Sequence, residues 1–211
     1  MTFVPKVYWK KTRVLRENEK TELAKKLADG YYIILTGDAG HLSSWLVSLG
    51  TLFTLGKWSK YSHSLMNCDY MDKPEDRDKF KFVEATVAGV HYSTFDEVFN
   101  CDFVCLLSPR GIKNEDWTAI IDALVKETGK EYDDLFDLID STKMSCVESV
   151  LNALKSHPRF ANDFFDLEYM IKKKKRLLPQ MFKDCRDFDA VWESKRAYRY
   201  VRISFMKGDE I

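Results

Sequence analysis

The sequence lacks an excess of charge of either sign. Its 211 residues include 33 lysines and arginines and 33 aspartates and glutamates, so the formal net charge is zero. A balanced chain creates no overall field that would attract the phosphate backbone of a nucleic acid. We therefore expect no nucleic-acid partner.

Long apolar runs are missing as well. The first 20 residues contain no apolar stretch of signal-peptide length. The most apolar segment, residues 42–58, is interrupted by serine, threonine and glycine and is shorter than the roughly 20 residues that a membrane-spanning helix needs. We expect neither a signal peptide nor an integral membrane span. The five cysteines are odd in number and scattered, which favours a reducing compartment over a disulfide framework. We expect a cytoplasmic protein, with release by another route as the alternative.

Motifs for metals and phosphates are also missing. Zinc sites need two close pairs of ligands. Cys101 and Cys105 fall within an expected strand, which points both to one face but leaves them too far apart to chelate easily. The Gly-Asp-Ala-Gly turn at residues 37–40 does not have the spacing of a phosphate-binding loop. We expect no metal and no cofactor. The basic run at residues 172–176 fits a solvated helix face, with contact to a phosphate or a membrane surface as the alternative.

Apolar residues, in contrast, are plentiful. They make up 45% of the chain, and aromatic residues make up 14%. That content is enough to bury a substantial core, and it excludes disorder as the main state. The length favours a single domain over residues 1–211.

The order of expected elements favours an α+β fold, with a small antiparallel sheet packed by helices. The connections are too irregular for a doubly wound parallel sheet. A loop is expected at residues 69–79, and a turn at Gly89 leads into a short helix near residues 95–99. Periodicity predicts further helices at residues 17–29, 42–56, 114–128 (with Asn114 as its cap) and 145–156, and strands at residues 31–36, 61–66, 80–86, 102–107 and 198–205.

Cys146 is the most informative cysteine. Helical apolar spacing begins at Val147, which places Cys146 in the first turn of a helix. Free amide N–H groups and the helix dipole at that end favour a thiolate, the form of cysteine that attacks an acyl carbon. The alternative is that Cys146 is a small buried apolar residue.

His63 and Glu84 are the other two candidates for chemistry. His63 lies in a strand-like segment and could act as a general base or be a hydrogen-bonded core histidine. Glu84 lies in a strand between apolar neighbours, where a buried carboxylate needs a partner such as a histidine. A glutamate that points to water from the edge of a sheet is the alternative. Together with Cys146 these residues supply a nucleophile, a base and an acidic group that orients the base.

Several segments around these residues follow one another in a recognisable order. They are residues 30–36, 60–64, 82–86, 89–90, 132–137 and 145–148, and more weakly residues 177–179 with Phe188. This ordered set resembles the permuted papain-like cysteine hydrolases of the NlpC superfamily, in the YiiX/YaeF branch, and the resemblance covers roughly residues 30–190. Two positions depart from the family pattern: Tyr31 stands where the family has an acidic residue, and Val147 replaces a small polar one.

The resemblance implies a circularly permuted papain-like fold, with a small sheet or half-barrel against which the cysteine helix packs. A helix before residue 30 and a strand after residue 190 would be additions to that core. It also implies that Cys146 is the nucleophile, His63 the base and Glu84 the third polar residue. Tyr132 lies in a matching segment and is a candidate to line the substrate pocket, or else an ordinary edge of the core.

The function that follows is that of a thiol-dependent hydrolase or acyltransferase acting on an amide or acyl-ester bond. Its substrate would be a peptide, a peptidoglycan-like crosslink or a lipid acyl group, and the sequence leaves these and the oligomeric state open. A non-catalytic binding module that retains the fold is the alternative. Catalysis requires the Cys146 sulfur within about 4 Å of a ring nitrogen of His63, whereas side chains that face apart would favour the binding module.

Overall fold

The structure is a computed structural model that describes residues 15–38, 42–69, 73–133, 143–158, 160, 165–174 and 177–194; for residues 42–46 and 165 it describes the backbone alone. Its helices are α1 (Glu17–Ala28), α2 (Leu42–Leu55), α3 (Phe95–Val98), α4 (Asn114–Lys126), α5 (Cys146–Ser156), α6 (Phe165–Lys174) and α7 (Pro179–Asp184), with a 3₁₀ turn η1 (Arg77–Lys79). Its strands are β1 (Ile33–Gly37), β2 (His63–Asn67), β3 (Lys81–Thr86), β4 (Gly89–Thr94), β5 (Phe103–Pro109), β6 (Glu131–Tyr132), β7 (Lys143–Met144) and β8 (Phe188–Glu193).

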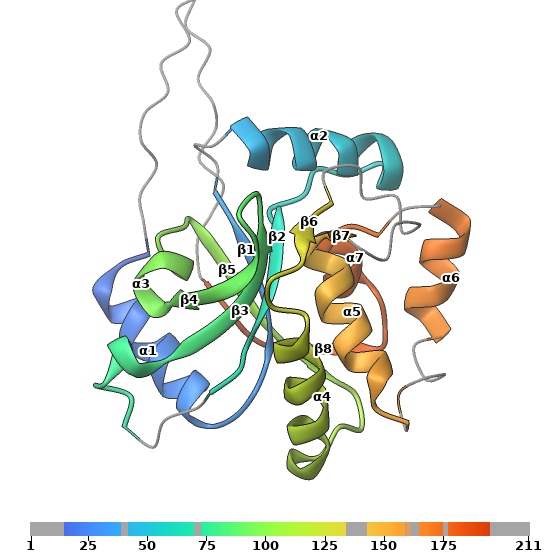
Figure 1. The fold of residues 1–211 in the computed structure, drawn as a ribbon. Coiled ribbons are helices and arrows are strands. Elements are labelled where there is room, and N and C mark those ends of the chain that lie inside the picture. Colours follow the sequence, from blue (N-terminus) through green and yellow to red (C-terminus); the bar gives the residue numbers. More distant parts are fainter. Residues whose placement is uncertain are drawn as a thin grey trace, which may run out of the picture.

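Six strands form one open antiparallel sheet in the order β4-β3-β2-β1-β5-β8. The helices pack on its two faces, with α1 and α3 on one side and α4 and α5 on the other (Figure 1). The expected α+β fold with an antiparallel sheet and covering helices is confirmed. The pair β6-β7 is separate and parallel, and it lies just before the helix that carries Cys146.

Alternation along the strands explains why the core has two layers. Successive side chains of a strand point to opposite faces, so in β1 Ile33 and Leu35 pack toward α4 and α5 whereas Ile34 packs toward α1. All five residues of β1 are buried, as expected for a central strand covered on both faces. The layer on the α1 side is rich in aromatic rings, among them Phe82 and Phe99, whose centroids lie 5.3 Å apart in an edge-to-face arrangement.

Several elements differ from the sequence-based expectation. The turn at Gly89 does not lead directly into a helix, because β4 intervenes and pairs with β3. Strand β8 and the short helix α7 were not predicted either, and α6 was identified only as a basic helix face. The N-cap of α4 is Lys113 rather than Asn114, and its backbone N–H donates to Asp116 Oδ2 at 2.8 Å. The strand expected at residues 198–205 lies outside the described residues.

Within the part of the chain that the structure describes, no helix combines the length and the apolar content needed to cross a membrane.

Candidate active site

Cys146 is the first residue of α5. The helix begins there because Ser145 and Glu148 form a reciprocal cap: the Ser145 N–H donates to Glu148 Oε2 at 2.8 Å, and the Glu148 N–H donates to Ser145 Oγ at 3.4 Å. The first N–H groups of a helix have no partner within it, so α5 presents donors and the positive end of its dipole beside the sulfur. Helix α5 packs against β2 and β3, which brings Cys146 to the middle of the sheet.

His63 and Ser64 begin β2 and meet the start of α5. The Ser64 side chain is fully buried, and its hydroxyl donates to the Cys146 carbonyl oxygen at 3.0 Å. This bond ties the first turn of α5 to the strand that carries His63. It therefore fixes the position of the thiol relative to the imidazole.

Glu84 lies on β3 and completes the group. In the β2–β3 register it faces Leu65, so His63 is its diagonal neighbour two positions along β2. The His63 Nε2 and Glu84 Oε2 atoms are 2.7 Å apart. The Ser93 hydroxyl donates to the other carboxylate oxygen, Oε1. The carboxylate thus has a donor on each oxygen, which is how a buried charge is stabilised.

Cys146 and His63 are close enough for the charge of each to shift the pKa of the other. Burial alone would raise the pKa of the Cys146 thiol, but His63, followed by Ser64, holds it below its ordinary value. Burial alone would lower the pKa of His63, but Cys146 and then Glu84 raise it. The pair therefore favours a thiolate beside an imidazolium. The structure brings Cys146, His63 and Glu84 together.

The carboxylate is tuned in the same direction. Burial acts to raise the pKa of Glu84, but the hydrogen bond and charge of His63, followed by Ser93 and His91, lower it. Glu84 is therefore ionised at neutral pH, so that it supports a positive charge on His63.

The other four cysteines have pKa shifts of the opposite sign. Burial raises the pKa of Cys68 to about 11 and that of Cys185 to about 12. Burial also raises the pKa values of Cys101 and Cys105. Among the five cysteines, only Cys146 is shifted toward the thiolate.

The three side chains differ in their exposure to solvent. Cys146 is 1% exposed, whereas the side chain of His63 is 23% exposed and that of Glu84 13%. Of the three, the imidazole is therefore the most exposed and the thiol the least.

Tyr132 belongs to the short strand β6. It pairs with Met144 of β7, two residues before Cys146, and it packs at the edge of the core layer that contains Cys146. The backbone thus holds Tyr132 close to the start of α5. Residues 134–137 of the same family segment lie outside the described residues.

Three contributors to the site were not assigned from the sequence. Ser64 donates to the backbone carbonyl of Cys146, and Ser93 donates to the carboxylate of Glu84. Both contacts depend on strand register, which cannot be seen in the sequence. The cap formed by Ser145 and Glu148 did carry a signal, because serine followed three residues later by glutamate before an apolar run is a typical helix start.

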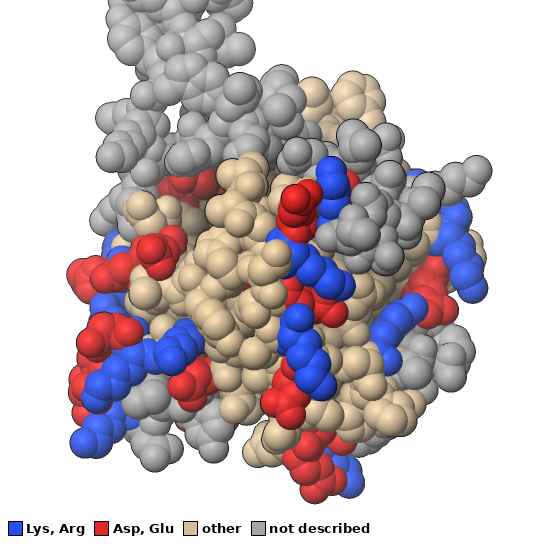
Figure 2. Space-filling view, viewed as in Figure 1, with Lys and Arg blue, Asp and Glu red and all other residues tan. Residues whose placement is uncertain are grey.

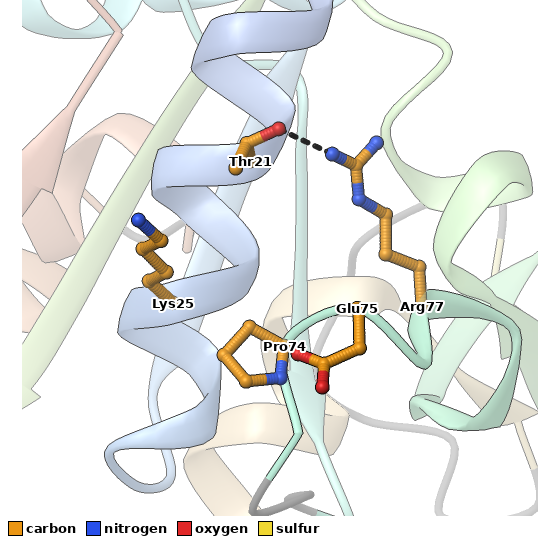
Figure 3. Close-up of a pocket in the computed structure, with 5 residues that line it drawn as sticks. All are labelled: Thr21, Lys25, Pro74, Glu75 and Arg77. Atoms are coloured by element: carbon orange, nitrogen blue, oxygen red, sulfur yellow. Dashed lines mark hydrogen bonds between the residues drawn. The ribbon is translucent and has the colours of Figure 1, made fainter.

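A depression between α1 and the segment before β3 is lined by Thr21, Lys25, Pro74, Glu75 and Arg77 (Figure 3). There the Arg77 guanidinium donates a hydrogen bond to Thr21 Oγ1 at 2.5 Å. The depression lies away from the candidate site, because α1 covers the face of the sheet opposite to α5. On the face shown in Figure 2, basic and acidic side chains are interspersed rather than gathered by sign, as the balanced composition leads one to expect.

Among solved structures, the crystal structure of the metalloprotein YiiX from Escherichia coli O157:H7 has a similar fold. The likeness covers 78% of this chain and 96% of that one, with a TM-score of 0.52 and 18% sequence identity. At this identity the likeness shows the fold alone, and at that level it agrees with the YiiX-like resemblance of the sequence. No family model and no curated protein matches the sequence.

The described residues of this chain do not fit a metal site. No group of three or more histidine, cysteine, aspartate or glutamate side chains among them is arranged to hold an ion. At the site itself both Glu84 oxygens already accept hydrogen bonds, and His91 lies with Nε2 3.8 Å from Glu84 Oε1 and Nδ1 3.0 Å from the Gly89 carbonyl oxygen. Cys101 and Cys105 do not share a face either, because Cys101 precedes β5 and the two pack in different core layers.

Proposed function

We propose that this protein is a thiol-dependent hydrolase or acyltransferase that cleaves an amide or acyl-ester bond through Cys146, His63 and Glu84. Two observations carry the proposal: an imidazole is bound at 2.7 Å to a carboxylate, and this imidazole and a thiol at a helix N-terminus shift each other's pKa in opposite directions. A nucleophile, a base and a group that orients the base are the parts that acyl transfer requires.

In the first half of the reaction the Cys146 sulfur attacks the carbonyl carbon of the substrate. A carbon–sulfur bond forms, and the electron pair of the carbonyl moves onto its oxygen. The free N–H groups of the first turn of α5 are donors for that oxyanion. When the carbonyl reforms, the leaving amine or alcohol departs with the proton that His63 received from the thiol.

In the second half of the reaction the acyl group is released from the thioester with Cys146. Water, or the hydroxyl or amine of an acceptor, loses a proton to His63 and attacks the thioester carbonyl. The carbon–sulfur bond breaks, and the proton returns from His63 to the Cys146 sulfur. Glu84 keeps the ring oriented and supports its positive charge in both halves. Tyr132 is proposed to line the path of the substrate near the start of α5.

A test that requires no knowledge of the natural substrate is acylation by p-nitrophenyl acetate. We expect a burst of p-nitrophenol followed by slower turnover, and one acetyl group on the tryptic peptide that contains Cys146. Cys146→Ser should abolish the burst, whereas Cys185→Ser, which removes a thiol with a raised pKa, should preserve it. A folded protein that gives no acetyl adduct at Cys146 would favour the non-catalytic binding module instead.

A further inference from the structure

We propose that Ser93 is a positioning residue of this site: its hydroxyl holds the Glu84 carboxylate in the orientation that presents Oε2 to His63. The inference rests on the proposed function, and it adds a fourth residue, from the edge strand of the sheet, to the three that the chemistry requires.

Strand register places Ser93 where this role is possible. In the β3–β4 hairpin Glu84 faces His91 and Phe82 faces Ser93, so Ser93 is a diagonal neighbour of Glu84. His63 is the diagonal neighbour of Glu84 on the other adjacent strand. A row of side chains therefore runs obliquely over β2, β3 and β4, with the carboxylate in the middle. Diagonal neighbours on adjacent strands lie about 7–8 Å from each other, a distance that a glutamate side chain can span.

Each oxygen of the Glu84 carboxylate has a different partner in this row. Glu84 Oε2 is 2.7 Å from His63 Nε2, and Glu84 Oε1 accepts the proton of the Ser93 hydroxyl. Ser93 is 5% exposed, although Tyr92 and Thr94 beside it on β4 are exposed. Burial of a single serine on an edge strand is understandable if its hydroxyl has a partner that needs it, and the carboxylate is that partner.

A competing orientation explains why the carboxylate needs holding. His91 Nε2 is 3.8 Å from Glu84 Oε1, too far for a hydrogen bond but close enough to attract the carboxylate if nothing else holds it. The terminal torsion of a glutamate is soft, so rotation toward His91 would cost little. Such a rotation would take Oε2 away from His63.

The remaining charge near Glu84 is already engaged. Glu97 on α3 senses the charge of Glu84, but its carboxylate accepts from the Thr94 N–H at 2.7 Å and the Thr94 hydroxyl at 2.8 Å. The described groups that face Glu84 are therefore His63, Ser93, His91 and, at longer range, Glu97. Of these, Ser93 is the uncharged donor, so its hydrogen bond to the carboxylate does not depend on a charge of its own.

The test measures the rate of alkylation of Cys146 by iodoacetamide as a function of pH, with the modified peptide identified by mass spectrometry. Four proteins are compared: wild type, Ser93→Ala, Ser93→Val and Ser93→Thr. Valine and threonine have nearly the same shape and differ in the hydroxyl, so this pair separates the hydrogen bond from packing. Thermal unfolding is measured for each variant to establish that it is folded. If the alanine variant is unfolded, the comparison of the valine and threonine variants still tests the proposal.

We expect the two variants without a hydroxyl to lose about tenfold in alkylation rate at mildly acidic pH and to reach half-maximal rate about one pH unit higher than wild type. Ser93→Thr should restore the wild-type profile. If wild-type Cys146 reacts at low pH but both Ser93→Val and Ser93→Thr have the wild-type profile, the positioning role is wrong and the proposed function stands. If wild-type Cys146 does not react below the ordinary pKa of a thiol, the proposed function itself fails.

Discussion

The Glu84→Gln substitution gives a quantitative test of the electrostatics of the site. Glutamine keeps the shape of the side chain and removes its charge. The lost contact is a charge-assisted hydrogen bond of 2.7 Å between side chains that are 23% and 13% exposed. Bonds of that kind contribute about 1.5–3 kcal/mol. Since one pKa unit corresponds to about 1.4 kcal/mol, we expect the pKa of His63 to fall by about 1–2 units.

The sign of the effect on activity follows from the two shifted groups. The reactive state requires Cys146 deprotonated and His63 protonated, so the rate rises as pH passes the lowered pKa of the thiol and falls as pH passes the raised pKa of the imidazole. Without the Glu84 charge the imidazolium is less stable, which lowers the alkaline limit. A thiolate with a weaker cation beside it is also less stable, which raises the acid limit. The pH range of the reactive state should therefore narrow from both sides.

The assay is the ultraviolet absorbance of the thiolate, titrated in wild type and in Glu84→Gln, with the Cys146→Ser protein subtracted from each. A suitable control is Glu115→Gln, which removes an exposed carboxylate that pairs with Lys113 at 3.5 Å on the surface of α4. We expect the control to titrate as wild type does. Identical thiolate curves for Glu84→Gln and wild type would refute the reasoning, because they would show that the carboxylate does not support the pair.

Two further substitutions, each with a matched control, test the fold. Gly37→Ala would place a Cβ 1.9 Å from the Lys60 carbonyl oxygen, so it should displace the chain that leads into β2. We expect it to lower the free energy of unfolding in urea by about 1–3 kcal/mol or more and to slow acetylation of Cys146. Gly50→Ala, whose new Cβ has no atom within 4 Å, should leave the rate of acetylation unchanged. Phe99→Ala should lower the free energy of unfolding by about 3–5 kcal/mol, because Phe99 is fully buried in the aromatic layer on the α1 side. Phe53→Ala, at an 82% exposed position, should change it by less than about 0.5 kcal/mol. Equal melting temperatures for these two variants would contradict the assigned core.

The elements that the sequence predicts well are those whose local pattern agrees with their place in the fold. Strand β1 is a continuous apolar run because both of its faces are covered, and α4 has an apolar stripe because one of its faces is. The edge strands β4 and β8 were missed because several of their side chains are exposed, which weakens the apolar signal. Pairing with a neighbour, rather than composition, makes these segments strands.

The candidate site also has features that the local sequence predicts and features that it does not. The position of Cys146 at a helix start could be predicted, because the capping signal and the apolar spacing are both local. The contact of His63 with Glu84 spans 21 residues, and the role of Ser93 depends on the register of a hairpin. Register and the packing of α5 on the sheet are tertiary properties. The residues could therefore be nominated from the sequence, but the donors that hold them could not.

The most direct test of the central claim is competitive alkylation of the five cysteines by a limiting amount of iodoacetamide at neutral pH. Cys68 is the half-buried member of the set and the one that accessibility alone would favour. We predict that Cys146 is modified first, because its pKa is lowered while those of the others are raised, and that His63→Gln removes this preference. Faster modification of Cys68, with Cys146 inert in the folded wild-type protein, would contradict the account.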